Sequence, residues 1–180
     1  MKTKKTPDRP RVLIFTGPGK GKTTAALGMA LRASGHGLRT LVIQFIKSDA
    51  STGELAAAKS LPHFEIEQHG LGFLPSAKSP KFPTHRAAAA RGLERARAAL
   101  ASGKYGLLIL DEICNAVAHG VLEEEPVCAL VASAPASCVL VLTGRGATER
   151  LRALADTVTE MTCVKHGMEA GWSAQKGVEF

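Results

Sequence analysis

Aromatic side chains are scarce in this sequence and make up 4% of its 180 residues. A buried core must therefore consist mainly of Leu, Val, Ile and Ala. Long apolar runs are missing as well. The most apolar stretch, residues 127 to 142, is interrupted by serines and by Pro135, which excludes a membrane span and predicts a helix end, a turn and a buried strand. The run VLIF at 12 to 15 is too short for the apolar part of a signal peptide.

Cysteine and histidine are present, but no CxxC, HxH or HxxxH pair occurs. We therefore propose no metal site built on these residues, and we expect the cysteines to be buried thiols in a reducing compartment such as the cytoplasm. A Gly-x-Ser-x-Gly elbow is also absent, which excludes that arrangement of a serine nucleophile. The cysteines are Cys114, Cys128, Cys138 and Cys163.

The net charge of +7 is unevenly distributed, because residues 1 to 11 carry five basic residues and one acidic residue. The rest of the chain is left with a charge of about +3, which suits a protein that binds an anionic small molecule. We expect residues 1 to 10 to form a basic flexible tail and residues 11 to 180 to form a single domain. A nucleic-acid binder that uses this tail is an alternative.

Short apolar runs alternate with longer segments of helical composition, which is typical of βα units around a mostly parallel sheet with helices on both faces. Helices are expected at 23–33, 84–101 and 147–155. Residues 68 to 83 carry three prolines and two glycines, so they predict a long loop that is either functional or disordered. The expected strands are 11–16, 39–46, 63–68, 106–111, 137–143 and 158–164.

The stretch TGPGKGKTT at 16 to 24 follows the first expected strand and opens a helix. It resembles the Walker A pattern G-x-x-x-x-G-K-[ST], except that Thr16 stands where the first glycine belongs. Glycines let backbone N–H groups turn toward an anion, and the start of the helix adds partial positive charge. Lys22 supplies a mobile charge, and the Thr23 hydroxyl can ligate Mg²⁺. This loop predicts a nucleoside triphosphate site.

Two more strand ends are expected beside this loop. The run LLILDE ends in Asp111 and Glu112, which is the Walker B arrangement and predicts that at least one of these carboxylates acts on Mg²⁺. The run LTGRG carries Arg145, which is expected to face the same crevice and contact the phosphate chain. Arg145 fixing a turn is the alternative. The fold alone does not choose among ATP reactions.

The chain resembles the P-loop type ATP:corrinoid adenosyltransferases of the cobalamin pathway over about residues 12 to 180. The resemblance implies a RecA-like P-loop fold, with ATP as co-substrate and Mg²⁺ as cofactor. The segments that carry it, in order, are TGPGKGKTTAALGMALRASGHG, VIQFIK, LDEI, LTGRG and ADTVTEMTCVKHGMEAGWSAQKGVEF.

The resemblance implies that the Co(I) of a corrinoid attacks the 5′ carbon of ATP and that the whole triphosphate leaves. It implies Mg²⁺ ligation by Thr23 and Glu112 with support from Asp111, while Lys22 and Arg145 are the candidate catalytic residues. It further implies a reversed nucleotide with C5′ toward the corrin, a possible flavoprotein reductant and a homodimer. The residues expected to hold the triphosphate are Gly17, Pro18, Gly19, Lys20, Gly21, Lys22, Thr23 and Thr24.

The long loop departs from the family pattern GxGFxW, because it reads GLGFLP. Phe73 is retained and is expected to line the corrinoid pocket, whereas Pro75 replaces the tryptophan. A loop aromatic packed on the core is the alternative for Phe73. For the whole chain, a RecA-like ATPase or a small P-loop kinase is the alternative function.

Overall fold

The computed structural model describes residues 8 to 179. Its centre is a six-stranded sheet with the order β3-β2-β4-β5-β1-β6, and every neighbouring pair of strands is parallel. This confirms the expected α/β class. The strands are β1 (Val12–Thr16), β2 (Thr40–Gln44), β3 (Phe64–Gln68), β4 (Leu107–Asp111), β5 (Val139–Thr143) and β6 (Thr157–Glu160).

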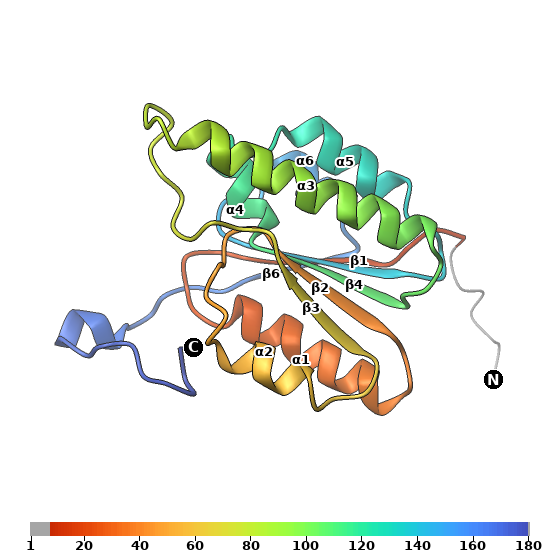
Figure 1. Ribbon diagram of the computed structural model, residues 1–180, viewed down its shortest axis with the longest axis horizontal. Helices are drawn as coiled ribbons and strands as arrows, with labels where there is room; N and C mark the ends of the chain where they lie inside the picture. Colours follow the sequence, from red (N-terminus) through yellow and green to blue (C-terminus); the bar gives the residue numbers. More distant parts are fainter. Residues whose placement is uncertain (1–7, 180) are drawn as a thin grey trace.

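Helices cover both faces of the sheet, with α1 and α2 on one side and α3 to α6 on the other (Figure 1). A parallel sheet needs this cover because both of its faces are apolar. The helices are α1 (Lys22–Gly35), α2 (Gly53–Ala58), α3 (Phe82–Ala101), α4 (Ile113–Ala118), α5 (Glu124–Ala132) and α6 (Glu149–Leu154), and a 3₁₀ turn, η1, spans Gly167–Ala170.

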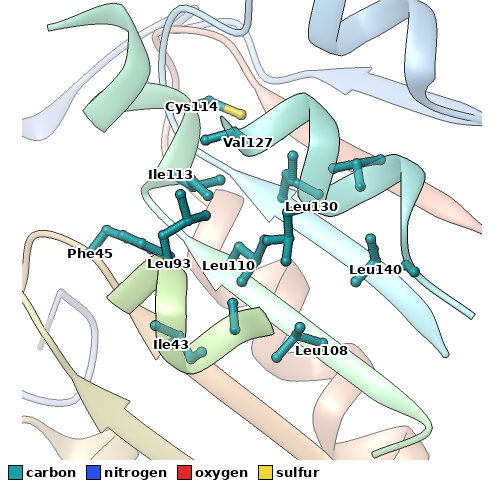
Figure 2. Packing of buried hydrophobic residues seen from close by; sticks show 14 of the residues in the cluster. Ile43, Phe45, Leu93, Leu108, Leu110, Ile113, Cys114, Val127, Leu130 and Leu140 are labelled. Carbon is teal, nitrogen blue, oxygen red and sulfur yellow. The ribbon is translucent and has the colours of Figure 1, made fainter. Parts of the chain in front are cut away.

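The larger core lies between the sheet and helices α3 to α5. Figure 2 shows Leu108, Leu110 and Leu140 of the sheet beside Leu93 of α3 and Leu130 of α5. All three strand residues are fully buried. The opposite face packs against α1 through small residues such as Ala26 and Ala30. The core therefore consists mainly of aliphatic side chains, as the scarcity of aromatic residues predicts.

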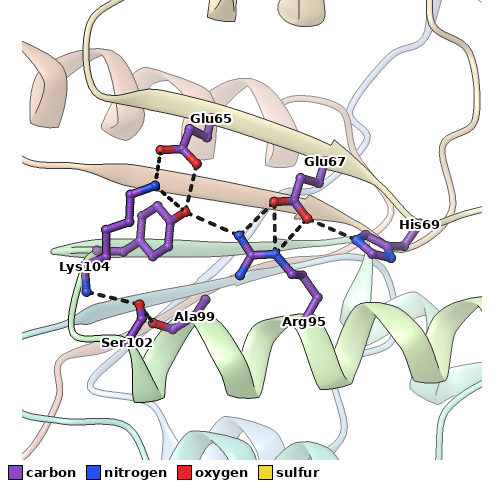
Figure 3. Close-up of polar contacts among 8 residues, drawn as sticks. Glu65, Glu67, His69, Arg95, Ala99, Ser102 and Lys104 are labelled. Atoms are coloured by element: carbon purple, nitrogen blue, oxygen red, sulfur yellow. Dashed lines mark hydrogen bonds and ion pairs between the residues drawn. The ribbon is translucent and has the colours of Figure 1, made fainter.

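A polar network joins the edge strand β3 to the end of α3 and the start of β4 (Figure 3). Arg95 donates to both carboxylate oxygens of Glu67 at 2.8 to 3.0 Å. Tyr105 donates to Glu65 at 2.8 Å, and Lys104 donates to the same carboxylate at 2.9 Å. These bonds fix helix α3 over the sheet and lie away from the loops that follow the central strands.

Several expected boundaries need correction. The last strand was expected at 158–164, but β6 ends at Glu160, because the chain then leaves the sheet and runs along the loop after β1. The first helix extends to Gly35 rather than residue 33. The helices α2 and α4 were not expected; each has only six residues, which is too short for a visible helical periodicity.

Residues 1 to 7 of the expected tail lie outside the described residues. Arg9, near the end of that tail, forms an ion pair with Asp156 just before β6, so this part of the tail contacts the folded chain. The Asp156 carboxylate also accepts from the Val12 N–H at 2.9 Å. Within residues 8 to 179, no helix is both long and apolar enough to cross a membrane.

The cysteines do not all behave as expected. Three are buried, but Cys163 is exposed because it lies in the segment that has left the sheet. Burial raises the pKa of the Cys114 thiol to about 12 and that of Cys138 to about 11. The expectation of four buried thiols is therefore wrong for Cys163.

Candidate functional site

The loop between β1 and α1 has the shape of an anion cradle, and Thr16 has a clear place in it. Thr16 is fully buried, and its hydroxyl accepts from the Ala147 N–H at 3.2 Å. The positive φ angles fall instead on Gly17, at 95°, and on Gly21, at 105°. A Cβ on Gly17 would lie 2.5 Å from the Met161 carbonyl oxygen, so this glycine is required by close packing. Thr16 thus anchors the loop to the segment after β5.

Lys22 is the first residue of α1 and is 7% exposed. Its ammonium donates to the carbonyls of Gly17 at 2.9 Å and Gly19 at 2.6 Å, so it lies inside the loop. Burial lowers the pKa of Lys22, Glu112 opposes this change, and Arg145 lowers the pKa further. Lys22, Glu112 and Arg145 all line the same cavity.

Not every loop N–H is directed at an open space. The Gly19 N–H donates to the Met161 carbonyl at 2.7 Å, which differs from the expected role of Gly19 as a phosphate donor. A Cβ on Gly19 would lie 2.6 Å from the Thr162 carbonyl oxygen. Lys20 also contacts the carboxyl-terminal segment, through an ion pair with Glu179 at 3.3 Å. The segment after β6 therefore closes one side of the cradle.

Asp111 ends β4 as a fully buried carboxylate. Its Oδ1 accepts from the hydroxyls of Thr23 at 2.8 Å and Thr143 at 2.7 Å. Its Oδ2 accepts from the Gln44 side-chain amide at 3.2 Å. Three strands and the start of α1 are joined at this one side chain. Asp111 therefore orients the Thr23 hydroxyl, while its supporting role toward Mg²⁺ stays a prediction.

Glu112 follows with a left-handed backbone, at φ 63° and ψ 18°, which turns its side chain away from the sheet. Its N–H donates to the Thr143 hydroxyl at 2.9 Å, and this bond fixes the turn. Burial raises the pKa of Glu112 and Asp111 raises it further, while Asn115, Lys22 and Arg145 oppose the rise. The buried Glu112 Oε2 has no hydrogen-bond partner within the protein.

Arg145 lies between two glycines of the β5–α6 connection. Gly144 has a φ of 130° and Gly146 a φ of 69°. A Cβ on Gly144 would lie 2.7 Å from the Asn115 nitrogen, and one on Gly146 would lie 2.9 Å from the Ala118 Cβ. The glycines thus let this connection pack against α4 while Arg145 lines the cleft. The expected placement of Arg145 is observed.

These groups line a central cleft of about 790 Å³ at the carboxyl ends of the strands. Phe73 of the long loop also lines it and is completely exposed, which excludes the alternative that Phe73 packs on the core. The residues on the phosphate side are Gly19, Lys20, Gly21, Lys22, Thr23, Thr24, Glu112 and Arg145, and the further lining residues include Ile46, Lys47, Glu54, Leu74, Asn115, His119 and Glu179.

Two side chains that line the cleft, Thr23 and Glu112, carry the kind of oxygen atoms that a magnesium ion prefers. Mg²⁺ binds hydroxyl, carboxylate and phosphate oxygens and usually retains several waters. Thr23 offers an oriented hydroxyl, and Glu112 offers a carboxylate oxygen that has no partner within the protein. The pair is therefore suited to hold Mg²⁺ together with a triphosphate.

Sequence reasoning did not select Gln44, Asn115 or Thr143 as site residues. Thr143 lies within the motif LTGRG that carries Arg145, and Gln44 ends a strand beside Asp111, so their positions at strand ends were the available signal. Asn115 lies on a helix that was not expected. The contact between Lys20 and Glu179 depends on the return of the carboxyl-terminal segment, for which the sequence offers no local signal.

Comparisons with known proteins agree with this geometry. Residues 8 to 180 match the family model of the ATP:corrinoid adenosyltransferase BtuR/CobO/CobP. A corrinoid adenosyltransferase of Pseudomonas aeruginosa is 44% identical over 96% of this chain and 85% of its own length. The corrinoid adenosyltransferases of Escherichia coli and Salmonella typhimurium are each 36% identical over 96% of this chain and 87% of theirs.

Proposed function

The chain belongs to the ATP:corrinoid adenosyltransferase family, and from that premise we propose how its cleft transfers the 5′-deoxyadenosyl group of ATP to a corrinoid. The chain is a transferase with ATP as co-substrate. The observation that supports the proposal best is that the phosphate loop, Arg145 and the exposed Phe73 line one cleft. An anion site and an aromatic surface are thus available to the two substrates together.

The reaction forms one bond and breaks another. The electron pair of Co(I) forms the Co–C5′ bond, and the pair of the C5′–O bond leaves with the triphosphate, so that cobalt becomes formally Co(III). Co(I) is already a strong nucleophile, so no general base is required. What the protein must supply is alignment of cobalt with C5′ and stabilisation of the charge that grows on the leaving triphosphate.

Lys22 and Arg145 meet the second need in this proposal. The Lys22 ammonium exchanges its carbonyl partners, Gly17 and Gly19, for phosphate oxygens, and Arg145 contacts the phosphate chain from the opposite connection. Loop N–H groups and the start of α1 add partial positive charge. These groups act on the triphosphate alone, which distinguishes the leaving group from the adenosyl group.

We propose that Thr23 and Glu112 hold Mg²⁺, with Asp111 orienting the Thr23 hydroxyl through its 2.8 Å bond. When bound, the ion neutralises charge on the triphosphate and so makes it a better leaving group. Glu112 must be ionised to serve as a ligand, and the approach of a cation opposes the effect of burial on its pKa. Asp111 keeps its hydrogen bonds to Thr23, Thr143 and Gln44.

Phe73 is proposed to contact the corrin. The nucleotide is proposed to bind in the reversed orientation, with its C5′ directed toward the corrin. The complete exposure of Phe73 supports its role, because an exposed aromatic ring loses unfavourable contact with water when a large planar ligand covers it. Pro75 stands where the family pattern has tryptophan, so in this chain Phe73 is the aromatic ring of that motif.

The domain organisation, cellular compartment, oligomeric state and reductant of the enzyme are proposed from the family resemblance. We infer a single adenosyltransferase domain at 11–180, action in the cytoplasm, a homodimer, and a flavoprotein that reduces the corrinoid to Co(I). The three buried thiols are compatible with a reducing compartment. No nucleic acid and no membrane is proposed as a partner.

The test is an anaerobic assay with ATP, Mg²⁺ and chemically reduced cob(I)alamin or cobinamide, followed by the absorbance change of Co–C bond formation. Lys22→Ala should reduce the rate by roughly 10²- to 10³-fold, because it removes a charge that stabilises the leaving group. Lys104→Ala is the matched control, since Lys104 pairs with Glu65 away from the cleft. Full activity of Lys22→Ala would contradict the proposed site.

A further inference from the structure

Asn115, the only asparagine of the chain, has an unexplained oxygen. Its Oδ1 is buried and has no hydrogen-bond partner. Five buried side-chain atoms in residues 8 to 179 are in this condition, on Thr40, Thr52, Arg97, Glu112 and Asn115. Only Glu112 and Asn115 among them line the central cleft. Two oxygens without partners therefore belong to residues that line the same cleft.

Such atoms are informative because a buried polar atom without a partner is unfavourable and uncommon in native proteins. A carboxylate oxygen and an amide oxygen are both acceptors and cannot donate. Whatever satisfies them must be a cation or must carry hydrogen-bond donors. A bare phosphate oxygen satisfies neither, which excludes a direct contact of Asn115 Oδ1 with the triphosphate.

The placement of Asn115 is determined by its neighbours. It lies about one helical turn after Glu112, and its backbone nitrogen lies 2.7 Å from where a Gly144 Cβ would be. The connection that carries Arg145 therefore packs directly on the base of this side chain. The His119 N–H donates to the Asn115 carbonyl at 3.0 Å, which fixes the backbone from the other side. The amide is thus held beside the phosphate end of the cleft.

We propose that the Asn115 Oδ1 accepts a hydrogen bond from a water coordinated to Mg²⁺, and that Asn115 is thereby a positioning residue for the ion that Thr23 and Glu112 hold. This inference rests on the proposed function, which supplies the ion. Mg²⁺ keeps several of its waters, and these waters are strong donors. Substitution of a residue that orients such a water changes the affinity for the metal, although the residue does not contact the metal.

The experiment measures the affinity of the protein–ATP complex for Mn²⁺ by electron paramagnetic resonance, with no corrinoid present so that ATP is not consumed. Asn115→Leu, which has the same branching and number of side-chain heavy atoms but no acceptor, should weaken Mn²⁺ binding about 10-fold. Asn115→Asp keeps an acceptor and should bind Mn²⁺ at least as tightly as the unmodified protein. Asn115→Ala is a second acceptor-free variant in case the leucine prevents folding.

Thr40→Val is the matched control. It removes another buried oxygen without a partner. Thr40 is the first residue of β2 and so lies at the amino end of the strand, away from the cleft, and Mn²⁺ affinity should not change. ATP affinity in the presence of EDTA should be the same for Asn115→Leu and the unmodified protein. If a donor on the nucleotide, such as a ribose hydroxyl, were the partner of Asn115 Oδ1, then Asn115→Leu would lower ATP affinity even without metal.

Three results would overturn the inference in different ways. Unchanged Mn²⁺ affinity in Asn115→Leu and Asn115→Ala would exclude the water contact while leaving the proposed site of Thr23 and Glu112 intact. An equal loss of ATP affinity with and without metal would assign Asn115 to the nucleotide. Absence of Mn²⁺ uptake by the unmodified protein with ATP would remove the metal site itself, and with it that part of the proposed function.

Discussion

Asp111 and Glu112 are adjacent carboxylates in opposite environments. Asp111 accepts three hydrogen bonds and is fully buried, whereas Glu112 lines the cleft and its buried Oε2 has no partner within the protein. The first residue therefore belongs to the architecture of the site, and the second is available for a ligand. The left-handed backbone at Glu112 is what separates them.

Substitution of these two carboxylates should separate stability from function. Asp111→Asn should lower the free energy of unfolding by about 2 kcal/mol, because a buried amide cannot accept all three donors. Glu112→Gln should bind Mn²⁺ weakly but unfold at an equal or higher denaturant concentration, since burial disfavours the charged form of Glu112. Urea unfolding at neutral pH measures both effects. A larger loss of stability for Glu112→Gln than for Asp111→Asn would contradict this assignment.

The cysteines allow a second test at this scale. Cys163 is exposed, while burial raises the pKa of the thiols of Cys114, Cys128 and Cys138. A thiol reagent at pH 8 should therefore modify one cysteine rapidly in the folded protein and all four after denaturation, because the thiolate is the reactive form. Cys163→Ser should abolish the rapid phase. A rapid phase that survives this substitution would show that a buried thiol is accessible.

Among the structural elements, the connection between β5 and α6 determines where α4 lies. Gly144 has a φ of 130° and its Cβ would lie 2.7 Å from the Asn115 backbone nitrogen. Any side chain at this position must push α4 away, and with it the helix start that carries Glu112. The two glycines around Arg145 are thus needed for contact between elements as well as for their backbone angles.

Gly144→Ala should consequently reduce adenosyl transfer by at least 10-fold, because misplacement of positioned groups by about 1 Å is costly for the rate. Gly103→Ala is the matched control: Gly103 also has a positive φ, 62°, but its Cβ would meet nothing within 4 Å. Gly103→Ala carries only the cost of a left-handed alanine, whereas Gly144→Ala adds a φ angle of 130° that alanine rarely adopts and the contact with α4. Similar rates for the two variants would exclude the role of this contact.

The elements also show what the sequence could predict. The strands β1 to β5 were anticipated because buried parallel strands are short apolar runs that end in turn residues. The last strand was drawn too long because alternation continues through Cys163, although the chain leaves the sheet after Glu160 to contact Gly19. Helices of six residues, such as α4, are too short to show periodicity, so the residues they bring to the cleft were not found.

At the scale of the whole molecule, the site is the meeting point of segments that are far apart in the chain. The order β3-β2-β4-β5-β1-β6 places the loops after β1, β4 and β5 side by side, and the connections from β1 and β5 run in opposite directions at this point. Such a reversal forms a crevice at the carboxyl edge of a sheet. The Walker motifs could therefore be predicted to meet, because their strands identify the edge.

Contacts that depend on three-dimensional packing could not be predicted in this way. Asn115 and Gly144 are 29 positions apart in the sequence, and Lys20 meets Glu179 only because the carboxyl-terminal segment returns to the loop. Neither pair has a distinctive pattern around it. The motifs identified the chemistry of the cleft, whereas its exact boundary required the positions of short helices and connections.

The central claim is that the triphosphate is the leaving group, so the most direct measurement is phosphorus NMR of the products formed from ATP and chemically reduced cob(I)alamin under anaerobic conditions. We predict inorganic triphosphate in a 1:1 ratio with a light-sensitive adenosylated corrinoid, because C5′–O is the bond that breaks. ADP with phosphate, formed without an adenosylated corrinoid, would contradict the account and indicate cleavage of a P–O bond.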